Sequence, residues 1–353
     1  MKIATIIGAR PQFIKAAMVT KEIAKKNDIY EVIIHTGQHF DENMSRIFFD
    51  EMGIPEPNYN LDIKSLSHGA MTGKQLQEIE KVLVKEKPDR VLVYGDTNST
   101  LAGSLAAAKL HITVAHVEAG LRSFNRKMPE EINRIIADHI SDFLFVPTDT
   151  AEKNLISEGI DKEKIIKVGD VMYDAVLYYG QQAEQHSNIL ERIQLTPKKY
   201  LLATIHRPEN TDTSEKLNNI FSALSEAPLP VVIPVHPRTR KKLAEYKIPM
   251  NGQLNPIDPV GYLDMMMLEK HASKIVTDSG GIQKEAYFHG VPCITIRDET
   301  EWVELVEAGV NHIVGSDKKR ISESLDNESS FIFRKKLYGD GHSGEKIVLE
   351  MMK

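Results

Sequence analysis

Short apolar runs alternate with longer amphipathic stretches along the first half of the chain. The apolar runs are rich in β-branched residues and the stretches between them have helical spacing, which is typical of βα units around a parallel sheet. The predicted strands are 3–7, 31–35, 90–94, 113–117, 143–146 and 165–168, and two of the predicted helices are 13–26 and 100–110. This pattern predicts an α/β fold.

A second series of the same kind begins near Tyr200. Its predicted strands are 201–205, 231–235, 274–277, 293–296 and 311–314, and a short amphipathic helix is predicted at 344–353. Residues 175–194, between the two series, are largely polar and helical in composition, and 195–199 form a predicted turn. We therefore predict two similar open sheets that face each other across a cleft, with a lobe boundary near residues 170–174.

Length, charge and cysteine content narrow the class of protein. A chain of 353 residues is longer than one hydrophobic core usually serves. The net charge of −6 argues against nucleic acid or a membrane surface as a general partner, although a local basic pocket could still bind a phosphate. The single cysteine, Cys293, excludes an intrachain disulfide and lies in an apolar run, so we expect a buried structural thiol. The N-terminal apolar run is too short for a signal peptide or membrane span, and we expect a cytoplasmic protein.

Five segments place charged or small polar residues directly after apolar runs. They are Gly8-Ala9-Arg10-Pro11, Gly95-Asp96-Thr97-Asn98-Ser99, His116-Val117-Glu118-Ala119-Gly120, His206-Arg207-Pro208-Glu209-Asn210 and Asp278-Ser279-Gly280-Gly281. In a parallel sheet this position is the carboxyl edge, where ligands bind. Three segments fall in the first half and two in the second, so we expect the site to be assembled between the two lobes.

The first of these segments has the features of an anion site. Gly8 provides a turn after a strand, and Pro11 suits the first turn of a helix. The free N–H groups at a helix N-terminus favour an anionic ligand, and Arg10 and Lys15 would add full positive charges. The alternative is an ordinary βα turn with solvated cations. The G-x-G-x-x-G pattern is absent, so an NAD site is not supported.

The last segment has a similar strand–loop–helix pattern. Gly280 and Gly281 allow the backbone to approach a pyrophosphate closely, and Ser279 can donate to an oxygen. Glu285 lies about one turn into the helix, where its carboxylate could accept hydrogen bonds from ribose hydroxyls. Such loops are common singly, but together with the Gly8 segment this one indicates a nucleoside diphosphate.

Several carboxylates point to acid/base chemistry. Asp96 and Glu118 each follow a strand on the same sheet edge, and Glu130 and Glu131 begin a helix after a flexible stretch. Acidic residues in a first helical turn also stabilise the helix by a few tenths of a kcal/mol. That explanation suits Glu130 and Glu131, but Glu118 is followed by Ala119-Gly120, a loop. Carboxylates that converge on one cleft are candidates for proton transfer.

Two histidines also end predicted strands. His206 and His236 are each a plausible phosphate donor or acid/base group, or a histidine satisfied by a backbone carbonyl. His35 and His39 have a spacing that two metal ligands could share, but no third ligand accompanies them. We therefore predict no metal site.

With these residues in place, the chain resembles the non-hydrolysing UDP-N-acetylglucosamine 2-epimerases from end to end. Besides the five segments, the resemblance rests on Leu121-Arg122, Pro129-Glu130-Glu131-Ile132-Asn133-Arg134, Thr277 and Tyr338-Gly339-Asp340-Gly341. It implies two Rossmann-like doubly wound parallel-sheet domains in the glycosyltransferase-B arrangement, at residues 1–170 and 171–336, and a final helix at 337–353 that returns to the first. It also implies a homodimer and inversion at C2 of a UDP-linked 2-acetamido sugar, without NAD or metal.

The resemblance also implies the roles of individual residues. The catalytic set is Asp96, Glu118, Glu130 and His206, while UDP is bound by Arg10, Lys15, His236, Ser279, Gly280, Gly281 and Glu285, and the sugar by Arg122 and Lys127. Which carboxylate serves which face of C2 stays open, and Glu131 is a substitute for Glu130. His206 could act mainly through the phosphates.

Departures from the family pattern point to one branch. Thr300-Glu301-Trp302-Val303-Glu304 replaces Thr-Glu-Arg-Pro-Glu, and Pro208 replaces an arginine. Residues 65–70 lack the Gln and acidic residue of members activated by their own substrate, which argues against such regulation. These changes resemble the branch that converts UDP-2,3-diacetamido-2,3-dideoxyglucuronate to its mannuronate epimer for surface polysaccharide. Lys127 and Arg126 are placed to meet the C6 carboxylate of that sugar.

Four other functions compete with this interpretation. They are epimerisation of UDP-N-acetylglucosamine to UDP-N-acetylmannosamine, a hydrolysing epimerase, a glycosyltransferase of the same fold, and a silent nucleotide-sugar binder. Release of free UDP distinguishes hydrolysis, and a requirement for an acceptor distinguishes glycosyl transfer.

Overall fold

The computed structural model describes residues 1–37, 53–327 and 337–353, and these divide into two compact units. The first unit is Met1–Tyr178 with Lys336–Lys353, and the second is Tyr179–Lys335. Each unit is built on its own parallel sheet, of seven strands in the first and six in the second. Two parallel sheets flanked by helices confirm the predicted fold class.

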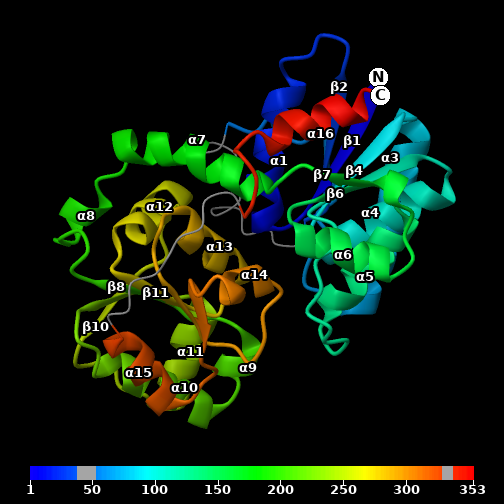
Figure 1. Ribbon diagram of the computed structural model, residues 1–353. Helices are drawn as coiled ribbons and strands as arrows, with labels where there is room; N and C mark the ends of the chain where they lie inside the picture. The colour runs from blue at the N-terminus through cyan, green and yellow to red at the C-terminus, as the bar shows by residue number, and fades with distance from the viewer. Residues whose placement is uncertain (38–52, 328–336) are drawn as a thin grey trace. The chain divides into compact units, whose positions relative to one another are not determined.

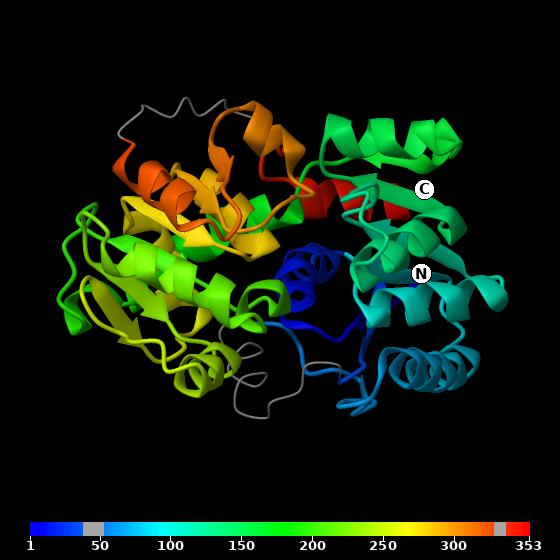
Figure 2. The ribbon, with the colours of Figure 1, turned by 90° about the horizontal axis from the view of Figure 1, so that it is seen from below.

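The first unit contains seven strands and the helices that cover them (Figures 1 and 2). The strands are β1 (Lys2–Ile7), β2 (Tyr30–His35), β3 (Tyr59–Asn60), β4 (Arg90–Tyr94), β5 (Thr113–Val117), β6 (Phe143–Val146) and β7 (Ile165–Lys167). The helices are α1 (Arg10–Ile23), α3 (His68–Glu86), α4 (Asn98–Lys109), α5 (Pro129–Ile140), α6 (Asp149–Ser157), η1 (Lys162–Lys164), α7 (Val171–His186) and α16 (Ser343–Met351). The strand order is β3-β2-β1-β4-β5-β6-β7.

The second unit repeats this design after the end of α7, which it shares with the first. Its strands are β8 (Leu201–Thr204), β9 (Val231–Pro234), β10 (Leu254–Ile257), β11 (Lys274–Thr277), β12 (Cys293–Thr295) and β13 (Asn311–Ile313). Its helices are α8 (Ile189–Arg192), α9 (Pro208–Thr211), α10 (Ser214–Ser225), α11 (Pro237–Glu245), α12 (Tyr262–His271), α13 (Gly280–Phe288), α14 (Val303–Glu307) and α15 (Lys318–Asp326). The strand order is β10-β9-β8-β11-β12-β13.

Each sheet has a switch point where the strand order reverses. It lies between β1 and β4 in the first sheet and between β8 and β11 in the second. In open parallel sheets, ligands bind beyond the carboxyl ends of the strands at such a point. The loops after β1 and β4 carry Gly8 and Asp96, and those after β8 and β11 carry His206 and Asp278. The topology therefore brings the predicted polar segments of each unit to one edge of its sheet.

Burial explains why the central strands are largely apolar. In the first unit, one face of the sheet packs on α3 and α4, and helix α1 contacts β1, β2 and β4. Strands covered on both faces need apolar residues at successive positions, because neither side chain direction leads to water. In the second unit Cys293 is buried, and burial raises the pKa of its thiol to about 12, as expected for a structural cysteine.

The final helix belongs to the first unit. Helix α16 packs along α1, so that a Cβ at Gly344 would lie 3.1 Å from the carbonyl oxygen of Met18 (Figure 1). The Gly344 N–H also donates to Asp174, on α7, at 2.8 Å. The two units divide after Tyr178, inside α7, and the lobe boundary that the sequence predicts, near residues 170–174, lies at the start of the same helix.

The structure differs from the predicted elements in the start of helix α1 and in two additional short strands, β3 and β10. Helix α1 begins at Arg10 rather than residue 13, because Gln12 Oε1 accepts from the N–H groups of Gly8 and Ala9 and satisfies that first turn. Strands β3 and β10 were not predicted. β3 spans only Tyr59–Asn60 at the sheet edge, and β10, at the edge of the other sheet, contains Pro256 and has only one buried residue.

Candidate active site

The loops after β1 and β4 are tied together by one glutamine. Besides its bonds to the Gly8 loop, the Gln12 side chain donates from Nε2 to the Tyr94 carbonyl oxygen at 2.8 Å and to Thr100 Oγ1 at 3.0 Å. The Thr97 hydroxyl caps α4 by accepting from the Thr100 N–H. The helix starts beside both loops are therefore fixed by neutral side chains.

Glu118 lies in the loop after β5 and pairs with Lys15 of α1. The two side chains form an ion pair, and each is less than one-tenth exposed. Glu118 has a left-handed backbone, with φ of 68°. Gly95, with φ of 61°, packs against the pair, since a Cβ there would lie 3.2 Å from Lys15 Nζ. Lys15 thus contacts a predicted catalytic carboxylate, and its predicted role at the diphosphate stays a prediction.

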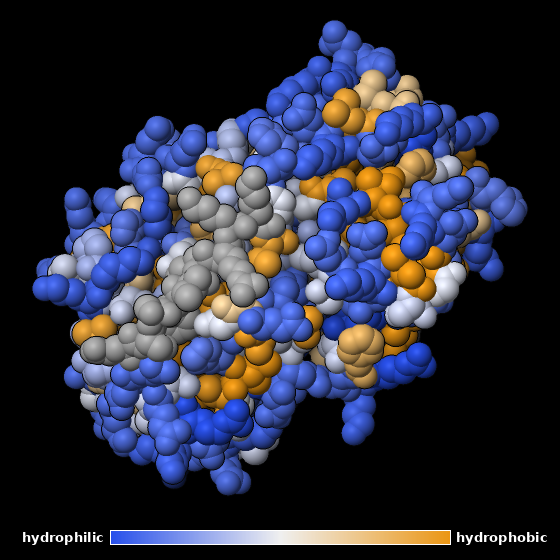
Figure 3. Space-filling model, in the orientation of Figure 1, coloured by the Kyte–Doolittle hydropathy of each residue, from blue (hydrophilic) through white to orange (hydrophobic). Residues whose placement is uncertain are grey.

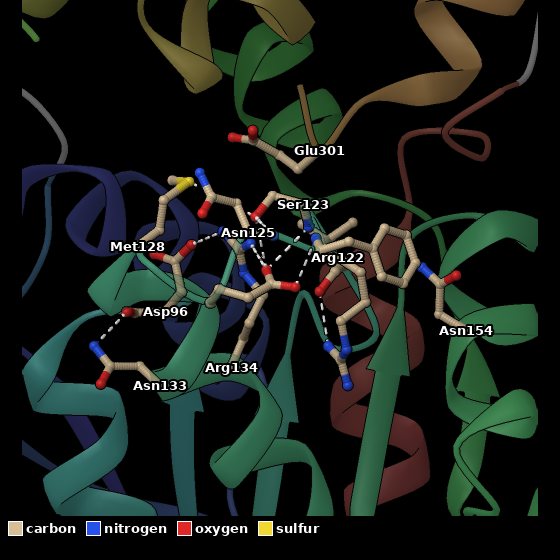
Figure 4. A network of polar contacts seen from close by, with 12 residues as sticks. Asp96, Arg122, Ser123, Asn125, Met128, Asn133, Arg134, Asn154 and Glu301 are labelled. Atoms are coloured by element: carbon tan, nitrogen blue, oxygen red, sulfur yellow. Dashed lines mark hydrogen bonds and ion pairs between the residues drawn. The ribbon is translucent and has the colours of Figure 1, made fainter. Parts of the chain in front are cut away.

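Asp96 is oriented by residues of helix α5 (Figure 4). Arg134 donates to its carboxylate at 2.6 Å, and Asn133 donates to its backbone carbonyl oxygen at 2.9 Å. The side chain of Asp96 remains about one-third exposed. Two consecutive helical residues therefore hold the backbone and the carboxylate of Asp96 while leaving part of the carboxylate accessible.

The two adjacent glutamates of α5 have different environments. Glu131 is buried and accepts from the N–H groups of Ser123 and Phe124 and from Arg134. Burial opposes its ionisation, but these donors outweigh burial and hold the pKa of Glu131 below its usual value. Glu130 is partly exposed and makes no hydrogen bond or ion pair with the described residues. Of the two, the structure leaves Glu130 available to a substrate.

Arg122 and Lys127 are both predicted to bind the sugar, and they lie in different environments, one buried and the other exposed. Arg122 is buried, and its guanidinium donates to Asp138 at 2.7 Å and to Glu158 at 2.7 and 2.6 Å. Those contacts favour a structural role for Arg122, whose sugar-binding role stays a prediction. Lys127 and Arg126 are exposed, in the loop directly before α5.

In the second unit, Asp278 organises the loop after β8. Asp278 is fully buried at the end of β11 and accepts from the N–H groups of His206 and Arg207 at 3.1 and 3.0 Å and from Asn210 at 3.0 Å. Its carboxylate also lies 3.2 Å from His206 Nδ1. Burial opposes the charge of Asp278, but His206, Asn210 and Arg207 outweigh it and lower its pKa. Asp278 thereby holds the proton on Nδ1 and leaves Nε2 of His206 for a ligand.

His236 stands beside His206, with ring centroids 5.9 Å apart. Burial, together with the positive charges of His206 and Arg238, lowers the pKa of His236. Its Nδ1 accepts from the Arg238 N–H at 3.2 Å, so neutral His236 carries its proton on Nε2. A neutral imidazole that donates from Nε2 suits a phosphate oxygen.

The predicted diphosphate loop begins helix α13. Ser279 is its N-cap residue and Gly280 its first residue, where a Cβ would lie 2.4 Å from Glu301 Oε1. No larger residue fits there without moving Glu301. Farther along α13, Glu285 is buried and Tyr262 Oη lies 3.3 Å from its carboxylate. These residues form a glycine-lined helix N-terminus with a carboxylate one turn away.

Two organising residues were not recognised from the sequence. The loop motif after the strand contains Asp278, but the sequence alone indicates no role for this residue, because only the pairing of β8 with β11 brings it to His206. Arg134 was likewise a motif residue without a role. Within residues 1–37, 53–327 and 337–353, no group of three His, Cys, Asp or Glu side chains could hold a metal ion. His39 lies outside these ranges, and no helix within them is long and apolar enough to cross a membrane.

Comparison with known proteins is consistent with this arrangement. A family model described as UDP-N-acetylglucosamine 2-epimerase matches residues 21–352. A Methanococcus maripaludis UDP-N-acetylglucosamine 2-epimerase homolog is 56% identical over 99% of this chain and 98% of its own. The UDP-2,3-diacetamido-2,3-dideoxy-D-glucuronate 2-epimerase of Pseudomonas aeruginosa is 52% identical over 98% of each chain. The crystal structure of Methanocaldococcus jannaschii UDP-GlcNAc 2-epimerase, in complex with UDP-GlcNAc and UDP, is similar with a TM-score of 0.92 and 47% identity, covering 100% of this chain and 99% of that one.

Two parallel sheets with polar loops at their switch points, and a glycine-lined helix start in the unit that holds the paired histidines, are typical of α/β proteins that bind a phosphate-bearing ligand. The chain belongs to the UDP-N-acetylglucosamine 2-epimerase family. It is therefore an isomerase that acts on a UDP-linked sugar.

Proposed function

We propose that this enzyme epimerises UDP-2,3-diacetamido-2,3-dideoxyglucuronate at C2. The observation that carries the proposal is the exposed cationic pair Arg126 and Lys127, directly before the helix that bears Glu130. The sugar of this substrate differs from N-acetylglucosamine in a C3 acetamido group and a C6 carboxylate, and such cations would bind the carboxylate. The Pseudomonas aeruginosa relative, named for this substrate, supports the choice.

The chemistry proposed is elimination followed by re-addition. A base removes the C2 proton while the anomeric C–O bond breaks, so that UDP leaves and a C1–C2 double bond forms. UDP then re-forms the bond at C1, and an acid delivers a proton to the opposite face of C2. Protons and bonds balance without an oxidant. The reaction needs cations or N–H donors on the diphosphate and proton carriers on both faces of C2.

The contacts support a division of labour among the candidate residues. Asp96, Glu118 and Glu130 are proposed as the proton carriers or as stabilisers of the positive charge that develops at C1. His206 and His236 present Nε2 atoms suited to phosphate oxygens, and we assign Ser279, Gly280, Gly281 and Glu285, with Arg10 and Lys15, to UDP. The ion pair between Lys15 and Glu118 links a proposed diphosphate ligand to a proposed acid/base group.

Loss of the Lys127 charge is expected to affect only the uronate substrate. In Lys127→Ala, kcat/KM for the UDP-diacetamidouronate should fall by about 10- to 100-fold, the worth of a hydrogen bond to a charged group. The value for UDP-N-acetylglucosamine should change less than about threefold. Lys153→Ala, which removes an exposed lysine of α6, is the matched control. Both values are measured by steady-state kinetics. An equal fall in kcat/KM on both sugars would show that Lys127 does not bind the carboxylate.

Epimerisation of UDP-N-acetylglucosamine itself is the second candidate. The Methanocaldococcus jannaschii relative named for that activity is 47% identical over 99% of this chain. The Neisseria meningitidis UDP-GlcNAc 2-epimerase bound to UDP-GlcNAc matches with a TM-score of 0.90. Under this alternative, wild-type kcat/KM would be higher for UDP-N-acetylglucosamine than for the uronate, and the comparison of the two rates decides between them.

A homodimer, a cytoplasmic location and a role in polysaccharide biosynthesis stay predictions. Figure 3 shows hydrophobic side chains gathered over α4 and α5 of the first unit. Ile132 and Ile136, one turn apart on α5, are 45% and 37% exposed. An exposed apolar helix face is compatible with self-association.

A further inference from the structure

A buried histidine of the first unit joins the loops that carry Asp96 and Glu118. His116 lies in β5 and is fully buried. Its Nδ1 lies 2.8 Å from the carboxylate of Asp138 and its Nε2 lies 2.7 Å from the carbonyl oxygen of Gly95. The carbonyl oxygen of Gly95 can only accept a hydrogen bond, and so can the carboxylate of Asp138 when it is ionised. The ring must therefore donate from both nitrogens.

The surrounding charges favour such a doubly protonated ring. Asp138, from α5, also accepts from Arg122 at 2.7 Å, and Arg122 in turn donates to Glu158. His139, the exposed neighbour of Asp138, lies 3.3 Å from Glu158. Burial opposes ionisation of Asp138, but its bonds with His116 and Arg122 outweigh burial and lower its pKa. With His116 doubly protonated, two cations and two anions alternate along a chain that is buried except at Glu158, and their charges balance.

The network fixes the backbone next to both carboxylates, at Gly95 before Asp96 and at Val117 and Gly120 around Glu118. Gly95, next to Asp96, donates its N–H to the Val117 carbonyl oxygen at 3.0 Å while its own carbonyl oxygen faces His116. Gly120, two residues after Glu118, donates to Asp138 at 3.1 Å. Gly95, Glu118 and Gly120 all have positive φ, which is costly for the non-glycine residue. External bonds are needed to hold such a backbone in place.

We propose that His116, held as an imidazolium by Asp138, is a positioning residue that sets the places of Asp96 and Glu118 for proton transfer at C2. Its ring makes no hydrogen bond or ion pair with either carboxylate side chain and acts through the two loop backbones. The inference rests on the proposed catalytic roles of Asp96 and Glu118. Displacement of a reacting group by about 1 Å costs on the order of 100-fold in rate.

The test compares two single variants, His116→Asn and the control His111→Asn. The control makes the same change at an exposed histidine just after α4. The His116 variant is expected to lose about 100-fold or more in kcat on the UDP-sugar that the wild type turns over. Its Kd for UDP should stay within about threefold of wild type, and His111→Asn should leave both values unchanged. A purely structural role would lower the Tm but leave the kcat of the folded enzyme within about threefold, and that result would overturn the proposal.

A spectroscopic readout on the wild-type enzyme does not depend on the variant folding. In protein labelled with ¹⁵N histidine, both ring nitrogens of His116 should carry slowly exchanging protons, because each donates to a buried acceptor. The signals are assigned by their absence from a His116 variant, or by their hydrogen-bonded shifts if that variant is unstable. A ring with one protonated nitrogen would overturn the proposal. Full activity in Asp96→Asn and Glu118→Gln would instead refute the proposed catalytic roles, whatever the state of His116.

Discussion

Glu118→Gln is expected to lower kcat by about 1000-fold while the protein stays folded. Glutamine has the size of glutamate but can neither take nor deliver a proton, and positioned acid/base groups contribute roughly 100- to 10,000-fold. The substitution also removes the anionic partner of Lys15. The Kd for UDP should change far less than kcat, because the change falls on the proton-transfer step. Turnover is measured by proton NMR of the UDP-sugar.

Glu163→Gln provides the matched control, since Glu163 is exposed in η1 and far in sequence from the candidate residues. Its kcat should equal that of the wild type. If the kcat of Glu118→Gln stayed within about tenfold of wild type, Glu118 would not be a proton carrier. Asp96→Asn and Glu130→Gln would then be measured in the same way.

Asp278→Asn is expected to damage both activity and stability. The buried carboxylate accepts from His206, Arg207 and Asn210, and an amide would turn an N–H₂ group toward some of these donors. Removing one partner of a buried charged network costs about 3 kcal/mol in unfolding free energy. The kcat/KM should fall by about 100-fold or more, because His206 would lose the acceptor that fixes its proton on Nδ1.

The loss of unfolding free energy in Asp278→Asn should be larger at neutral pH than at acid pH. The folded-state pKa of Asp278 is depressed, so its contribution is full above the unfolded carboxyl pKa of about 3.9 and disappears as pH falls through the lower folded value. Urea unfolding should therefore show a large difference from wild type near pH 7, and this difference should shrink progressively as the pH falls below about 4. His206→Asn, which keeps Asp278, should lose similar activity but less unfolding free energy. An equal loss of unfolding free energy in both variants would contradict the inference that Asp278 organises this loop.

The fold could be predicted because its strands are buried on both faces. Residues 90–94, 113–117, 143–146 and 274–277 are strands with the predicted bounds, and in each of them every residue after the first is buried. Strand β10, LNPI, could not be predicted from such a pattern, because it lies at an edge and includes a proline. Where helices start depended on side-chain caps such as Gln12, which local spacing does not reveal.

The predicted site residues of each unit lie at its sheet edge, but their partners could not be predicted. The ion pair between Lys15 and Glu118 joins residues 103 positions apart. Which of Glu130 and Glu131 turns inward depends on the phase of α5, set by its start at Pro129. Arg122 has the residue type expected for an anionic ligand, yet two carboxylates of its own unit already occupy it.

The most direct test of the proposed chemistry is proton NMR of the enzyme with the UDP-diacetamidouronate in deuterated water. C2 inversion through elimination and re-addition predicts that deuterium enters C2 of the epimer while the sugar stays attached to UDP. Formation of the epimer with the original proton still at C2, or steady accumulation of free UDP and free sugar, would contradict the account.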